Sequence, residues 1–73
     1  MTVAEIRDRV ATIDRMKGDD EAAHCFEDDL YYDFVDYVAS RSASELETRV
    51  PELIEMAQEL RKVRDIDFER WRA

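Results

Sequence analysis

The chain has 73 residues with 45% apolar content, and its 19 acidic and 11 basic side chains give a net charge of −8. This length allows one small domain, residues 1–73, and the apolar fraction is typical of a chain that folds. The negative charge argues against direct nucleic-acid binding, and no apolar stretch reaches the length of a membrane span.

Cysteine usage and the first residues bear on the compartment. The single cysteine, Cys25, cannot close an internal disulfide, which suits a reducing environment. The opening residues MTVAEIRDRV lack the apolar segment of a signal peptide. We therefore expect a cytoplasmic protein.

The residue pattern predicts an all-α fold. One glycine and one proline supply little material for β-turns, and no segment alternates with period two. We expect a small three-helix bundle of antiparallel helices, with a short extra turn and a C-terminal tail packed on the bundle.

The first helix is predicted over residues 3–17. Thr2 and Glu5 have the spacing of a capping box, in which each side chain satisfies a free backbone N–H group. Apolar residues then recur at three- and four-residue steps: Val3, Ile6, Val10 and Ile13. Gly18 follows, and glycine can end a helix in the left-handed conformation.

The second helix is predicted over residues 20–39, with Asp19 or Asp20 as its cap. One apolar line runs along it: Ala23, Phe26, Leu30, Phe34 and Tyr37. A second row lies beside that line: Tyr31, Val35 and Val38. Together they form an arc wide enough for two neighbouring helices, and wide enough for a homodimer in which a second copy covers part of it.

The last part of the chain contains a second capping-box spacing, Ser44 to Glu47, which predicts a helical turn over residues 44–49. A third helix is predicted over 51–64, with Pro51 as its first residue. Its apolar stripe consists of Leu53, Met56, Ala57, Leu60 and Val63. The tail is expected to fold back on the bundle through Ile66, Phe68 and Trp71, and the alternative for Trp71 is a role in docking.

Two passages resemble a family of small helical proteins found in actinobacteria and their phages. The first is DDEAAHCFEDDLYYDFVDYVA at residues 19–39, which contains the pattern D-E-A-A-H-x-x-E-D-x-L; the second is RDIDFERW at 64–71. The match does not extend to the middle of the chain. The resemblance implies a phage- or prophage-related helical protein, and it assigns no catalytic residue.

The net charge of the chain is concentrated in one segment. Residues 18–40 contain eight acidic residues and no lysine or arginine, so the rest of the chain is balanced. On the second helix, the side opposite the apolar arc carries Glu21, Asp28, Asp29, Tyr32 and Asp36. We expect these residues to bind a basic partner protein. The alternatives are a face that is merely solvated and a mimic of DNA phosphates that inhibits a nucleic-acid-binding protein.

The same segment contains a potential metal-binding spacing. Glu21, His24 and Glu27 lie one turn apart, and histidine with carboxylates can bind zinc or iron. The chain has no second histidine, so the other interpretation is a histidine that makes local hydrogen bonds to a carboxylate. Cys25 is adjacent to His24, but neighbouring helical residues point about 100° apart and do not form a nucleophile–base pair. We expect no metal site, no cofactor and no enzymatic activity.

Overall fold

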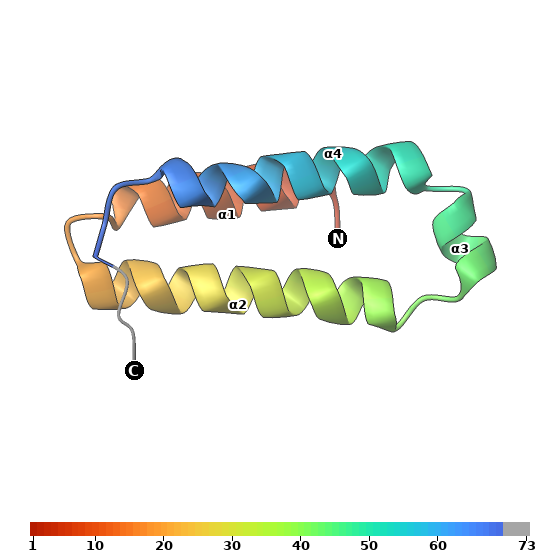
Figure 1. Ribbon diagram of the computed structural model, residues 1–73, viewed down its shortest axis with the longest axis horizontal. Coiled ribbons are helices and arrows are strands. Elements are labelled where there is room, and N and C mark those ends of the chain that lie inside the picture. The colour runs from red at the N-terminus through yellow and green to blue at the C-terminus, as the bar shows by residue number, and fades with distance from the viewer. Residues whose placement is uncertain (70–73) are drawn as a thin grey trace.

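The computed structural model describes residues 1–69. All regular secondary structure in this part of the chain is helical. The elements are α1 (Val3–Arg15), α2 (Asp20–Ala39), α3 (Ala43–Glu47), α4 (Val50–Arg61) and the 3-10 turn η1 (Lys62–Asp65). In Figure 1, α1 and α4 run in the same direction, α2 runs in the opposite direction, and α3 connects α2 to α4 at one end. The predicted all-α class is confirmed.

The starts of the first two helices follow their predicted caps. The Thr2 hydroxyl accepts a hydrogen bond from the Glu5 N–H at 3.1 Å, and the Asp19 carboxylate accepts one from the Ala22 N–H at 3.1 Å. The prediction for Gly18 was wrong, because no described residue has a positive φ. Instead, the Met16 carbonyl accepts a hydrogen bond from the Asp19 N–H at 2.8 Å, so the turn closes without a left-handed residue.

The capping box near α3 lies two residues before its predicted position. The Ser42 hydroxyl accepts from the Glu45 N–H at 3.3 Å, and the Glu45 carboxylate accepts from the Ser42 N–H at 3.4 Å. Because α2 ends at Ala39, Ser42 is the extended residue that can cap α3, and Ser44 lies inside the helix. α4 begins one residue before Pro51, and the final turn predicted for this helix is the 3-10 turn η1.

One core receives buried side chains from every long helix, from η1 and from the tail. Its members are Ile6, Ile13, Ala23, Leu30, Tyr37, Met56, Leu60, Val63 and Phe68. Phe68 of the tail is buried, and the Asp20 carboxylate accepts a hydrogen bond from the Glu69 N–H at 3.0 Å. Trp71, also expected in this tail, lies outside the described residues.

The apolar arc of α2 is only partly covered. Ala23, Leu30 and Tyr37, each seven residues apart, are buried, whereas Phe26 was expected on the same line and is 43% exposed. α1 packs against both α2 and α4. The Cα atoms span 41 × 24 × 15 Å, so every helix keeps one long side in solvent and the flanks of the arc remain exposed. Within residues 1–69, no helix is both long and apolar enough to cross a membrane.

Candidate functional site

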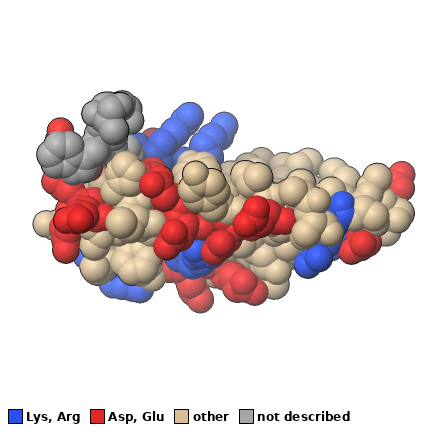
Figure 2. All heavy atoms as spheres, turned by 90° about the horizontal axis from the view of Figure 1, so that it is seen from below, with Lys and Arg blue, Asp and Glu red and all other residues tan. Residues whose placement is uncertain are grey.

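The outward side of α2 carries the five residues predicted to bind a partner. Glu21, Asp28, Asp29, Tyr32 and Asp36 are all exposed, and we refer to them as the acidic face. At about 100° per residue they fall within an arc of about 100°, opposite the buried Ala23, Leu30 and Tyr37. Figure 2 views the molecule from the α2 side and shows carboxylates along this helix with uncharged side chains between them.

Tyr32 lies at the centre of the acidic face. It is 70% exposed, the largest exposed fraction among the large apolar and aromatic side chains of residues 1–69. Its neighbours one helical turn away in each direction are Asp28, Asp29, Val35 and Asp36, and Val35 is itself 59% exposed. The face therefore has an exposed aromatic ring at its centre with carboxylates around it, and one exposed aliphatic side chain, Val35, lies at its edge.

The carboxylates of α2 fall into two groups. Several already have partners: Asp33 accepts from Arg9 of α1 at 2.8 Å, and Asp28 lies 3.1 Å from the His24 ring. Glu21, Asp29 and Asp36 form no ion pair or side-chain hydrogen bond with any residue in 1–69. These three carboxylates supply the charge of the acidic face that remains available to a partner.

His24 makes the local contact that was one of its two predicted roles. Its Nε2 lies 3.1 Å from an Asp28 carboxylate oxygen, and its Nδ1 has no hydrogen-bond partner within residues 1–69. Metal-binding histidines usually donate the second ring N–H to a carboxylate or carbonyl, which fixes the ring. In the described part of the chain, no three potential ligands converge, so Glu21 and Glu27 are not brought together around His24. Cys25 is an exposed free thiol.

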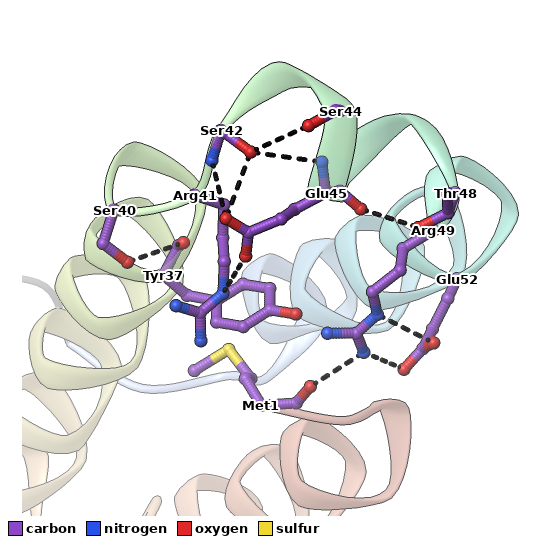
Figure 3. Close-up of polar contacts among 10 residues, drawn as sticks. All are labelled: Met1, Tyr37, Ser40, Arg41, Ser42, Ser44, Glu45, Thr48, Arg49 and Glu52. Atoms are coloured by element: carbon purple, nitrogen blue, oxygen red, sulfur yellow. Dashed lines mark hydrogen bonds and ion pairs between the residues drawn. The ribbon is translucent and has the colours of Figure 1, made fainter.

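A polar cluster around Tyr37 was missed by sequence reasoning. The guanidinium groups of Arg41 and Arg49 lie 4.7 and 5.4 Å from the centre of the Tyr37 ring. Arg49 also donates to the Met1 carbonyl at 3.2 Å and pairs with Glu52, as Figure 3 shows. The four-residue spacing from Tyr37 to Arg41 could have predicted the first contact. The cluster joins the ends of three helices and brings no reactive groups together.

Ion pairs also shift the pKa values of two glutamates on α4. A hydrogen bond from Arg49 lowers the pKa of Glu52, and hydrogen bonds from Lys62 and then Arg7 lower the pKa of Glu59. Both shifts keep the carboxylate ionised. The partners of these two glutamates lie on α1, at the start of α4 and on η1, so neither shift involves a residue of the acidic face.

Comparison with known proteins adds no assignment, because no protein-family model, curated protein or solved structure matches the chain. The family resemblance of residues 19–39 and 64–71 therefore stays a prediction.

Proposed function

We propose that this chain is a small, non-enzymatic interaction module that docks a basic partner protein through the acidic face of α2. The observation that carries the proposal is the position of Tyr32, which is 70% exposed and bordered by Asp28, Asp29 and Asp36. An exposed aromatic ring surrounded by carboxylates is typical of a protein-binding surface, where tyrosine is a frequent anchor.

The physical argument has two parts. The unpaired carboxylates of Glu21, Asp29 and Asp36 attract a basic surface during encounter, and they fix its orientation once it is bound. Tyr32 and Val35 then lose their contact with water, which supplies the apolar part of the binding energy. Because all of these side chains project from one helix, little backbone order has to be gained on binding.

The finer architecture belongs to the same proposal. We treat α1, α2 and α4 as a three-helix antiparallel bundle that holds the acidic face rigid, and this is supported by the reversed direction of α2 and by the shared core. Binding is favoured over catalysis because the acidic face is the outer surface of a single helix. An enzyme needs groups that converge from several elements around a cleft. A phage- or prophage-related role rests on the family resemblance alone.

A pull-down with charge-reversed variants tests the proposal. Asp29→Lys/Asp36→Lys should keep the helical spectrum, because both residues are exposed and lie opposite the core. It should lose the basic proteins that wild type captures from lysate. The matched control is Asp8→Lys/Glu47→Lys, which changes the net charge equally at exposed positions on α1 and α3. Equal capture by wild type and Asp29→Lys/Asp36→Lys would contradict the proposal.

The second candidate function is a DNA mimic that inhibits a nucleic-acid-binding protein. Competition with DNA distinguishes it from docking of a basic partner. A mimic needs carboxylates in a continuous array, whereas Tyr32 and Val35 interrupt the array on α2 and Asp33 is already paired with Arg9. Capture of a DNA-binding protein that duplex DNA displaces in full would favour the mimic. Capture that persists in the presence of DNA would favour docking on a surface other than the DNA site.

A further inference from the structure

The outward side of α4 is largely apolar, whereas the outward side of α2 carries carboxylates. A shallow groove there is lined by Ile54, Ala57, Gln58 and Arg61. Ile54 is 53% exposed, and Val50 extends the apolar surface by one turn toward the start of the helix. These residues lie on the side of α4 opposite the buried Met56 and Leu60, so the groove points away from the core. We call these four lining residues the α4 groove.

Arg61 gives the α4 groove a positive end on a chain whose net charge is −8. The acidic residues of α4 do not neutralise it, because Glu55 pairs with Arg7 at 3.3 Å and Glu59 pairs with Arg7 at 3.2 Å and with Lys62 at 3.0 Å. Arg61 itself forms no ion pair within residues 1–69. The groove is thus a shallow, open and largely apolar surface with one cation available.

We propose that the acidic face of one copy of this chain docks in the α4 groove of a second copy. This inference rests on the proposed function to the extent that the acidic face is a docking surface, and it names one partner surface, in which Arg61 supplies the positive charge. The ring of Tyr32 would pack against Ile54 and Ala57, and Arg61 would pair with Asp36 or stack on the ring. Arg61 is opposite in charge to the acidic face, and the exposed Tyr32 side chain faces a shallow apolar groove.

The arrangement of the two surfaces fixes the type of assembly. α2 and α4 lie along opposite edges of the molecule in Figure 1, and both surfaces point away from the core, so one chain cannot satisfy its own groove. The contact is therefore head-to-tail, and it grows as a chain unless the rotation closes a ring. A symmetric contact between two α2 helices is disfavoured, because it would place Asp29 and Asp36 against the carboxylates of the other copy.

The area of one helix face is small compared with that of a stable dimer, and two chains of like net charge repel each other at long range. We therefore expect weak association at physiological salt. Sedimentation equilibrium from about 10 μM to about 1 mM covers the range in which such a contact is populated. The weight-average mass of wild type should rise steadily above the 8.7 kDa of one chain.

Two truncating variants make the test specific. Tyr32→Ala/Asp36→Ala removes the projecting part of the acidic face, and Ile54→Ala/Arg61→Ala removes the apolar wall and the cation of the α4 groove. All four residues are exposed and alanine is the best helix former, so both variants should keep the fold, which circular dichroism and a thermal melt check. Each variant alone should remain at the mass of one chain. A mixture should form a dimer, twice 8.7 kDa, that does not grow, because each variant keeps the surface that the other lacks.

The outcomes separate this inference from the proposed function. Wild type that stays at 8.7 kDa over the whole range overturns the inference, as does self-association that persists in either variant alone. Because Ile54→Ala/Arg61→Ala leaves the acidic face intact, it should still capture basic proteins from lysate. Loss of self-association with capture retained supports both ideas. Capture without self-association in wild type supports the proposed function and rejects the α4 groove as the partner surface.

Discussion

The guanidinium group of Arg49 lies 5.4 Å from the centre of the Tyr37 ring and also donates a hydrogen bond to the Met1 carbonyl at 3.2 Å. Through this one side chain, the residue that precedes α4 contacts the end of α2 and the start of the chain. The contact is polar, but it lies at the edge of the apolar core, where Tyr37 is buried. It should therefore contribute more to stability than the exposed ion pairs do.

Replacing Arg49 with alanine should lower the free energy of unfolding by about 1–3 kcal/mol, because a hydrogen bond to the Met1 carbonyl and a cation–π contact are lost together. In a domain of this size, each kcal/mol corresponds to roughly 4–8 °C in Tm. The control is Arg41→Ala, which also loses a contact with the Tyr37 ring, at 4.7 Å, but whose other contact is an exposed ion pair with Glu45 at 4.0 Å rather than a hydrogen bond to Met1. A thermal melt in which Arg41→Ala costs as much as Arg49→Ala would contradict this expectation.

Removing the Tyr37 hydroxyl should be neutral or stabilising by up to about 1 kcal/mol. The oxygen is buried and has no hydrogen-bond partner within residues 1–69, so its desolvation is uncompensated there. Tyr37→Phe keeps the ring that Arg41 and Arg49 contact, whereas Tyr37→Leu loses it. Urea unfolding of the two variants checks the difference. A clear loss of stability in Tyr37→Phe would mean that the hydroxyl has a partner.

The position of the capping box can be tested with two serines. Ser42→Ala should destabilise the protein by about 1 kcal/mol, the usual effect of losing a helix cap. Ser44→Ala should have little effect, because Ser44 lies within α3 and alanine favours a helix. Chemical denaturation of both variants decides between the box at Ser42 and Glu45 and the box predicted at Ser44 and Glu47. A larger loss in Ser44→Ala would favour the predicted position.

Stability should fall as the pH drops through the acidic range. Ion-pair partners lower the pKa of Glu52 and of Glu59 in the folded protein below the usual value of 4.5. Between the folded and unfolded pKa values, the unfolded chain binds more protons, so the stability from these two groups is present above about pH 4.5 and is lost below it. Glu52→Gln/Glu59→Gln should therefore show a smaller loss between pH 6 and pH 3.5. The test is the urea midpoint of wild type and of the variant, measured across this pH range. If the two midpoints fall in parallel as the pH drops, the two glutamates do not contribute to the loss of stability.

Much of the helical pattern was predictable, because its signals are local. Residues 20–39 were predicted as a helix and form α2, since the Asp19 cap and the apolar repeat both lie within that segment. Which serine caps α3, Ser42 or Ser44, could not be predicted from local signals, because it depends on where α2 ends. Phe26 lies at the right phase for burial but is 43% exposed, because the degree of burial depends on packing between helices and not on helical period alone.

The candidate site also has features that the sequence predicts and features that depend on how the helices pack. The exposure of Tyr32 and its neighbours followed from helical phase, since they lie opposite Ala23, Leu30 and Tyr37. The pairing of Asp33 with Arg9 did not, because it depends on how α1 sits against α2. For the same reason, the sequence did not separate Glu21, Asp29 and Asp36 from the acidic residues that the fold already uses.

Two long-range hydrogen bonds, one at each end of the molecule, determine when the chain can finish folding during its synthesis. Met1 is joined to Arg49 across 48 positions, and Asp20 is joined to Glu69 across 49. The two spans overlap between residues 20 and 49, so neither half of the chain contains both partners of either bond. On the ribosome, one end can be fastened only after Arg49 has emerged, and the other only after Glu69 has emerged. Folding should be a single, late and cooperative event, and a prematurely terminated chain should be an open substrate for proteases.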